Sequence, residues 1–138
     1  MKWSVGLIVL PYLILCAGLY FSQDYLIFLP DRLPESHAFR MGEEVELEVE
    51  DQVYLNCLWI REKSSETTEG VILYLHGNKG NNRRCIHQIK RLTGSGYDIF
   101  MPDYRGFGKS DGRIHSEEQL YADAQDVLDY LEKIYGKN

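Results

Sequence analysis

Two short segments carry the residues of this chain whose types and spacing could do chemistry. The first is His76-Gly77-Asn78, and the second is Gly108-Lys109-Ser110-Asp111-Gly112. Backbone N–H groups beside a glycine can approach a substrate closely and stabilise an oxygen atom that becomes negatively charged during acyl transfer. A serine in the pattern G-x-S-x-G can be the nucleophile of such a reaction. These residue types permit acyl-transfer chemistry, and their surroundings decide whether the serine can act as a nucleophile.

Ser110 lacks the surroundings that a nucleophile needs, although the letters of its segment match. The pattern requires a hydrophobic strand that runs into the first glycine and a helix that starts directly after the serine. Here Arg105-Gly106-Phe107 precedes the segment and Asp111-Gly112-Arg113 follows the serine, so both flanks are predicted loops. A phosphate-binding P-loop is also disfavoured, because Asp103 stands where its first glycine is required. We expect Ser110 to be a structural residue.

The remaining candidate groups do not favour a metal, a cofactor or a nucleic acid. Zinc sites use CxxC pairs or i, i+4 pairs on a helix, and neither spacing occurs among His76, Cys85, His87 and His115. The three cysteines of the chain define no disulfide framework. A formal net charge of −6 argues against nucleic-acid binding, which needs a concentrated basic surface. We expect no metal, no cofactor and no nucleic-acid partner.

Strand–helix units must position these segments. Val71–Leu75 is a continuous apolar run, typical of a strand that is buried on both faces of a parallel sheet, and Asp98–Met101 predicts the next strand. Apolar residues at helical spacing predict a helix over Arg83–Thr93, closed by Gly94 and Gly96. The alternation of strands and helices predicts an α/β sheet.

A long helix and a hairpin complete the predicted domain. Ser116 is a predicted N-cap, and Gln119 completes a capping box. The helix that follows reaches Ile134 and has an apolar stripe formed by Leu120, Ala124, Val127, Leu128 and Leu131. Before the first strand–helix unit, apolar and acidic residues alternate strictly between Glu43 and Glu50, which predicts a half-buried strand with an acidic outer face. Asp51-Gln52 makes the turn, and Val53–Arg61 returns as the second strand of the hairpin.

The N-terminal segment predicts a membrane anchor. Trp3–Phe21 contains no charged residue. Its length is close to what a helix needs to cross ~30 Å of hydrocarbon. A cleaved signal peptide is the first alternative, but the small residues Cys16-Ala17-Gly18 form no A-x-A site ahead of the polar boundary. A lipoprotein signal ending at Cys16 is the second alternative, and there Leu15 is too bulky. We expect an uncleaved single-pass anchor with a cytoplasmic N-terminus, because Lys2 precedes it.

Three segments together resemble the N-terminal half of a membrane-anchored α/β-hydrolase, related to serine aminopeptidases and acyl-protein thioesterases. They are Gln23-Asp24-Tyr25-Leu26-Ile27-Phe28-Leu29-Pro30, Leu75-His76-Gly77-Asn78-Lys79-Gly80 and Pro102-Asp103-Tyr104-Arg105-Gly106-Phe107-Gly108-Lys109-Ser110-Asp111-Gly112. The resemblance implies that the backbone of Gly77 and Asn78 contributes to the oxyanion hole and that His76 is structural. It also implies that the nucleophile lies on the next strand, so no residue of this chain is assigned as catalytic.

The resemblance also sets the expected organisation and activity. Residues 1–22 are expected to be the anchor, residues 23–42 a juxtamembrane linker, and residues 43–138 a partial α/β-hydrolase domain that is truncated before the nucleophile strand. The implied activity is serine-dependent hydrolysis of an ester, thioester or amide, absent from the chain alone and supplied together with a complementary C-terminal segment. The bilayer is the expected partner of Trp3–Phe21. The alternative is a non-catalytic, membrane-tethered interaction domain.

Overall fold

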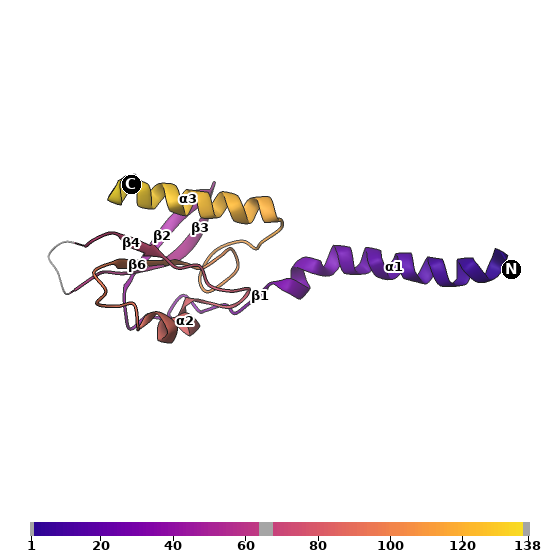
Figure 1. The fold of residues 1–138 in the computed structure, drawn as a ribbon, viewed down its shortest axis with the longest axis horizontal. Coiled ribbons are helices and arrows are strands. Elements are labelled where there is room, and N and C mark those ends of the chain that lie inside the picture. The colour runs from indigo at the N-terminus through magenta and orange to yellow at the C-terminus, as the bar shows by residue number, and fades with distance from the viewer. Residues whose placement is uncertain (1, 64–67, 137–138) are drawn as a thin grey trace.

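The computed structural model describes residues 2–63 and 68–136 and places a sheet between two helices, with a third helix projecting away from them (Figure 1). The elements in chain order are α1 (Lys2–Ile27), β1 (Leu29–Pro30), β2 (Glu43–Glu50), β3 (Val53–Ile60), β4 (Val71–Leu73), β5 (Lys79–Gly80), α2 (Asn82–Ile89), β6 (Asp98–Pro102) and α3 (Glu117–Tyr135). Helix α3 covers one face of the sheet and α2 covers the other.

The main sheet has four strands in the order β2-β3-β6-β4. Strands β2 and β3 form the predicted antiparallel hairpin, with Gln52 in the left-handed region at φ 58° in its turn. Strand β6 pairs antiparallel with β3 and parallel with β4. The predicted α/β class, with an antiparallel hairpin followed by parallel strand–helix units, is confirmed.

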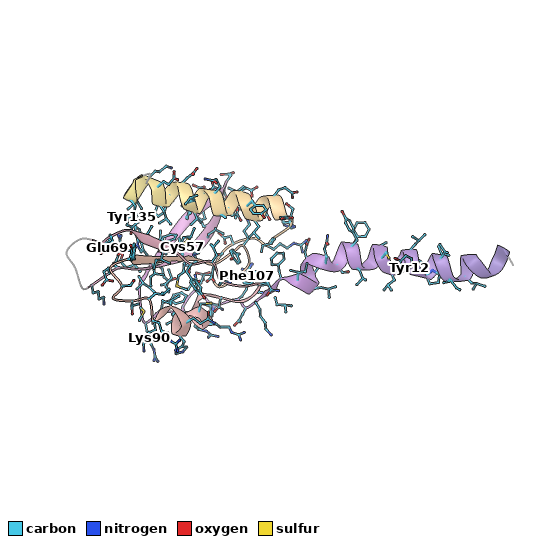
Figure 2. The ribbon with its side chains drawn as sticks, in the orientation of Figure 1. Tyr12, Cys57, Glu69, Lys90, Phe107 and Tyr135 are labelled. Atoms are coloured by element: carbon cyan, nitrogen blue, oxygen red, sulfur yellow. The ribbon has the colours of Figure 1, made fainter. Side chains whose placement is uncertain are left out.

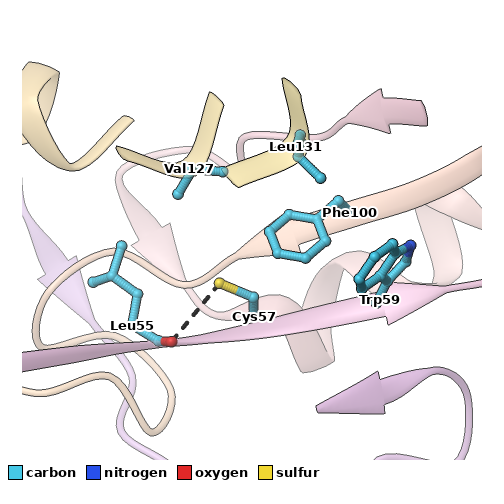
Figure 3. Close-up of a cluster of buried hydrophobic side chains, with 6 residues drawn as sticks. All are labelled: Leu55, Cys57, Trp59, Phe100, Val127 and Leu131. Carbon is cyan, nitrogen blue, oxygen red and sulfur yellow. Dashed lines mark hydrogen bonds between the residues drawn. The ribbon is translucent and has the colours of Figure 1, made fainter. Parts of the chain in front are cut away.

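Each face of the sheet packs a separate group of buried side chains. On the α3 face, Figure 3 shows Phe100 of β6 between Trp59 of β3 and the helix, and the Trp59 and Phe100 rings meet edge to face with centroids 5.4 Å apart. On the α2 face, Ile89 packs with Ile99 and Met101 of β6, and all three are buried. Strand β6 contributes to both groups, as a strand inside an α/β sheet must.

The hairpin and α2 follow the sequence with small differences. Val45, Leu47 and Val49 are half-buried and pack on the α3 face, while the alternating glutamates are exposed. Helix α2 begins one residue earlier than predicted, at Asn82, and ends at Ile89 rather than Thr93. Beyond Ile89 the chain forms a turn, in which the Leu92 amide donates to the Ile89 carbonyl. The strongly positive φ angles of Gly94 and Gly96 then redirect the backbone into β6.

Helix α3 has the predicted cap but a narrower buried stripe. The Ser116 hydroxyl accepts a hydrogen bond from the Gln119 amide at 3.2 Å, while the Gln119 side chain accepts from the His115 amide rather than from Ser116. Val127 and Leu131 are buried against the sheet, whereas Leu128 is 41% exposed and Ile134 is also exposed. Leu128, a member of the predicted apolar stripe, is thus not covered by the described residues, whereas the helix does reach past Ile134 as predicted.

Strand β4 is shorter and less buried than predicted. It ends at Leu73, and its three residues are half-buried rather than buried on both faces. The reason is its position at the edge of the sheet, where β6 is its neighbour in the described part of the chain. Tyr74 still donates its amide to the Phe100 carbonyl, but Leu75, which was expected to lie in the buried strand, is 47% exposed.

Helix α1 continues past the predicted apolar segment to Ile27, and nearly all of its described side chains are exposed. Its Leu7–Ile27 portion is long and apolar enough to cross a membrane by length and composition. Beyond the helix, residues 29–33 join the body of the protein. Strand β1 pairs parallel with β5, Arg32 bridges to Gly108, and Leu33 is buried. Part of the segment expected to be a juxtamembrane linker is therefore packed.

Candidate active site

The loop after β4 presents Gly77 and Asn78 to solvent at the carboxyl end of the strand. Both residues are exposed, and a side-chain carbon built on Gly77 would meet no atom within 4 Å. Within the described part of the chain, neither the Gly77 amide nor the Asn78 amide donates a hydrogen bond. Two neighbouring N–H groups that are not engaged can donate to an oxygen atom of a bound molecule.

The end of α1 holds this loop in place. The Asn78 side chain donates to the Ile27 carbonyl at 2.7 Å, and the Leu29 amide donates to the Asn78 carbonyl at 2.9 Å. Ile27 is the last residue of α1, so its carbonyl is one of the acceptors that a helix end leaves unpaired. The short β1–β5 ladder continues the contact through Asp31, whose amide donates to the Gly80 carbonyl at 3.1 Å. The loop and the end of helix α1 are thus joined by direct hydrogen bonds.

His76 lies behind the exposed loop rather than within it. Its side chain is fully buried, with Nε2 3.1 Å from the Asp103 Oδ1 atom and Nδ1 2.7 Å from the Gly77 carbonyl oxygen. The Tyr104 ring lies against the imidazole with centroids 4.3 Å apart, and the Tyr104 hydroxyl donates to the His76 carbonyl at 2.6 Å. Burial raises the pKa of Tyr104 to about 12, so this hydroxyl keeps its proton. His76 therefore supports the loop, as the resemblance implied, and is inaccessible to a substrate.

Asp103, at the start of the loop after β6, contacts His76 in the loop after β4. Its Oδ1 atom accepts a hydrogen bond from the Asn82 amide at 2.8 Å, at the start of α2. Burial raises the pKa of the Asp103 carboxyl, although His76 and the Asn82 amide act in the opposite direction. A side-chain carbon at Gly108 would lie 2.0 Å from Asp103 Oδ2, and Gly108 has a φ of +54°. Only glycine fits at this position.

Ser110 is a structural residue in this arrangement. It is fully buried, its hydroxyl accepts from the Asn56 amide at 2.9 Å, and it donates to the Asp103 carbonyl at 2.7 Å. The next residue, Asp111, accepts from the Tyr54 amide at 3.0 Å. The loop after β6 is thereby fastened to β3, and the Ser110 hydroxyl has no open approach. This geometry agrees with the expectation that Ser110 is a structural residue.

Arg105 fastens the same loop to α3 and to the hairpin. Its guanidinium donates to both carboxylate oxygens of Asp123 at 2.8 Å and to Glu50 at 2.5 Å. Hydrogen bonding to Asp123 is the largest of the influences that raise the pKa of Arg105. Sequence reasoning missed Asp123, which is buried on α3 like Val127. A single acid at helical spacing within an apolar stripe was the available signal.

The sequence of this chain is similar to those of known proteins. The sequence profile described as serine aminopeptidase, S33, matches residues 66–138, slightly more than half of the chain. The chain is 29% identical to the protein bem46 of Schizosaccharomyces pombe over 95% of its own length and 46% of that protein. It is 38% identical to a zebrafish (Danio rerio) protein named lysophosphatidylserine lipase ABHD12, over 54% of its own length and 20% of that protein. The chain thus spans less than half the length of these two relatives.

Solved structures agree on the fold. The chain matches an esterase of Pyrococcus furiosus with a TM-score of 0.56 at 22% sequence identity, over 80% of this chain and 43% of the esterase. It matches an α/β serine hydrolase homologue from Coxiella burnetii with a TM-score of 0.54 at 23% identity, over 74% of this chain and 50% of that protein. At these identities the likeness concerns the architecture of the sheet and its helices.

Proposed function

Because this chain belongs to the serine aminopeptidase S33 family of α/β-hydrolases, we propose that it supplies the N-terminal half of a membrane-anchored serine hydrolase. The proposed reaction is hydrolysis of an ester, thioester or amide bond. In this reaction Gly77 and Asn78 donate their backbone N–H groups to the oxygen of the tetrahedral intermediate. The observation that carries the proposal is the pair of exposed amides at the carboxyl end of β4, without acceptors among the described residues.

The chemistry of the loop requires preorganised donors, and the surroundings supply that rigidity. Stabilisation of an oxyanion is effective when the donors are fixed before the reaction, because no reorganisation is then needed as charge develops. His76 and Tyr104 hold the loop from its buried side, and β1 holds it from the other side. Such a loop differs from a flexible surface turn, in which the same amides would have to be ordered at each turnover.

The nucleophile is proposed to come from a further strand that pairs with β4. The outer edge of β4 faces a groove of about 220 Å³ whose lining includes Val71, Leu73, Leu128 and Tyr135. An additional strand would cover the exposed Leu128 and pair the backbone groups of β4, since unpaired strand edges accept further strands. A residue at the carboxyl end of that strand would lie beside Gly77-Asn78. A complementary C-terminal hydrolase segment of this kind is the proposed partner.

The bilayer is the second proposed partner. At roughly 1.5 Å per residue, the Leu7–Ile27 portion of α1 is about 31 Å long, which matches the hydrocarbon core. Lys2 places the N-terminus in the cytoplasm in this proposal. Because the Asn78 side chain donates a hydrogen bond to the Ile27 carbonyl, the candidate oxyanion site lies beside the end of the proposed membrane helix. This position favours amphipathic or membrane-bound substrates.

The proposal is tested by completing the sheet. The chain is expressed alone and as a chimera with the part of bem46 that follows its matched region, and both are assayed with p-nitrophenyl acetate and a fluorophosphonate probe. We expect labelling and ester hydrolysis from the chimera and neither from the chain alone, because Ser110 is buried and hydrogen-bonded. The matched control is the bem46 segment alone.

Two outcomes would contradict the proposal. Labelling of the isolated chain at Ser110 would show that this buried serine is a nucleophile, contrary to the proposal. A chain that is a stable monomer with a cooperative unfolding transition, and that gives a folded but inactive chimera, would favour the non-catalytic interaction domain instead. Extraction by alkaline carbonate or high salt would separately contradict the anchor, since a spanning helix resists both treatments.

A further inference from the structure

A cavity of about 190 Å³ lies between the last turn of α1 and the loop after β6. Its lining combines aromatic and aliphatic side chains with arginines, and it includes Tyr25, Phe28, Phe107, Ile114, Arg32 and Arg113. Figure 2 shows Phe107 in the part of the domain nearest to α1. Pro30 of β1 lines the cavity, so the cavity lies close to the same helix end as the β1–β5 ladder, but neither Gly77 nor Asn78 is among its lining residues.

Two of the three arginines that line this cavity, Arg32 and Arg113, have no carboxylate partner in the described part of the chain. Arg32 donates to the Gly112 carbonyl at 2.8 Å, and Arg113 donates to the Tyr25 hydroxyl and to His115 Nδ1. Each guanidinium has five N–H groups, so most of these donors stay available to a ligand. Arg105 also borders the cavity, but Asp123 and Glu50 already neutralise it.

One acid, Asp24, lies on the same wall, so two guanidinium groups face a single carboxylate. The excess positive charge is local, because the chain as a whole carries a formal net charge of −6. Glu50 at the end of β2 and Asp123 of α3 reach the border of the cavity, and both are paired with Arg105 there. A general attraction of the protein to anionic surfaces is therefore not expected, and binding of an anion here depends on this particular pocket.

We propose that this cavity binds the phosphate head group of an anionic phospholipid from the membrane that α1 spans. The inference rests on the proposed membrane anchor and adds a lipid site to it. Tyr25 and the last turn of α1 lie where a spanning helix leaves the hydrocarbon, which is the depth of the lipid phosphates. Arginine recognises phosphate through paired hydrogen bonds, and the adjoining Phe28 and Ile114 offer an apolar surface for the glycerol and the first acyl carbons.

The site is tested by the retention of lipids on the full chain in detergent. The purified chain is mixed with equal amounts of phosphatidylglycerol and phosphatidylcholine of identical acyl chains, and native mass spectrometry measures which lipid stays bound. We expect one phosphatidylglycerol to be retained in preference by about tenfold, the effect of a charge-assisted hydrogen bond. The assay involves no hydrolysis and no bilayer insertion, so it can fail or succeed independently of the proposed function.

Matched variants locate the preference. Arg32→Gln/Arg113→Gln should bind the two lipids alike, whereas Arg40→Gln/Arg91→Gln removes the same charge from exposed positions outside the cavity and should behave as the wild type. Arg32→Lys/Arg113→Lys keeps the charge and should retain a reduced preference for phosphatidylglycerol. Thermal unfolding checks that the variants fold. If the cavity variants do not fold, the lipid preference of the wild type and its competition with glycerol 3-phosphate still test the proposal.

Three results would overturn the proposal. Equal retention of the two lipids by the wild type would show that the arginines do not select an anionic head group. An unchanged preference in Arg32→Gln/Arg113→Gln would place the lipid elsewhere on the protein. Displacement of phosphatidylglycerol by millimolar glycerol 3-phosphate would assign the cavity to a soluble phosphate compound instead of a membrane lipid.

Discussion

The loop after β4 and the loop after β6 leave the same edge of the sheet, yet they differ in almost every physical property. The first exposes Gly77 and Asn78, whose amides have no acceptors among the described residues. The second is buried along most of its length, and Arg105 and Ser110 fasten it to three other elements. Both contain glycine, but glycine provides open space in the first loop and relieves crowding in the second.

This difference shows that buried side chains hold the loops in place, whereas the exposed backbone amides are the groups available to a bound molecule. Side chains with the chemistry of an active site, His76, Asp103 and Ser110, are all buried in the supporting layer. The groups that remain available are backbone amides, which carry no side-chain signature. A preorganised oxyanion site needs such a layer, since its donors must not move as charge develops. Substitutions in the two loops should therefore have effects of very different size.

The largest effect is expected from placing a methyl group in the buried loop. Gly108→Ala forces a carbon to 2.0 Å from Asp103 Oδ2 in a left-handed backbone. The substitution should reduce the free energy of unfolding by more than about 5 kcal/mol. Gly77→Ala is the matched control, with open space around it, and should cost less than about 1 kcal/mol. Urea unfolding in detergent micelles measures both, and similar costs for the two variants would remove the distinction between the loops.

Removal of the arginine that crosses the buried loop should have the next largest effect. Arg105→Ala leaves Asp123 buried without its partner, which should cost about 3–5 kcal/mol of stability. Arg91 occupies an exposed position after α2. Arg91→Ala should therefore change the stability by less than about 0.5 kcal/mol. Thermal unfolding of the two variants under the same conditions makes the comparison, and an Arg105→Ala chain as stable as the control would mean that Asp123 is hydrated in the absence of the guanidinium.

The exposed loop should matter for catalysis through its backbone. In the active chimera, Asn78→Pro removes the amide N–H and should cost about 2.7–4 kcal/mol of transition-state stabilisation. Asn78→Ala keeps that N–H and loses only the hydrogen bond to the Ile27 carbonyl, so most of kcat/KM should remain. His76→Ala should fall between the two, because it disturbs the support of the loop. Equal and severe losses for both Asn78 variants would assign the chemistry to the side chain.

The smallest expected effect is a pH dependence that distinguishes the two ends of β6. Burial raises the pKa of Asp103 above 3.8, so between 3.8 and the folded-state pKa the folded chain binds more protons than the unfolded chain. This contribution lowers stability as the pH rises through that interval. For Asp98, burial acts to raise the pKa, but bonds from the Glu62 amide, Tyr135 and Arg61 bring it below 3.8. Its stabilisation is complete above 3.8 and is lost as the pH falls through the lowered pKa.

The measurement is the unfolding free energy from pH 2 to pH 7 for the wild type, Asp103→Asn and Asp98→Asn. Subtracting each variant from the wild type should give slopes of opposite sign, and a difference of one in pKa corresponds to about 1.4 kcal/mol. Slopes of the same sign would mean that the His76 contact, rather than burial, dominates the titration of Asp103.

The sequence predicted the parts of this fold that have a repeating pattern. Alternation between Glu43 and Glu50 predicted β2, and the apolar stripe with Ser116 predicted α3 and its cap. Ser110 could be rejected as a nucleophile because its neighbours did not have the pattern of a strand and a helix. These inferences depend on periodicity and flanking residues, which are local properties of the chain.

The remainder depends on contacts between distant segments. Strands β1 and β5 have two residues each, too few to show any alternation, so their pairing and the contact between Asn78 and Ile27 left no signal. The exposure of Leu128 could not be read from its spacing, because spacing gives the face of a helix but not the width of the sheet beneath it. The pairing of Arg105 with Asp123 likewise needed the folded structure.

The strand order β2-β3-β6-β4 also fixes the sequence of events while the chain is being made. The β2–β3 hairpin has a two-residue turn and can form as soon as it leaves the ribosome. Strand β4 cannot join it, because its neighbour in the sheet is β6, which begins only at Asp98. Synthesis at roughly 5–20 residues per second takes about 1–5 s to advance from Leu73 to Asp98. During that delay the apolar segment Val71–Leu73 has no strand to pair with. Chaperones can bind the segment in this period.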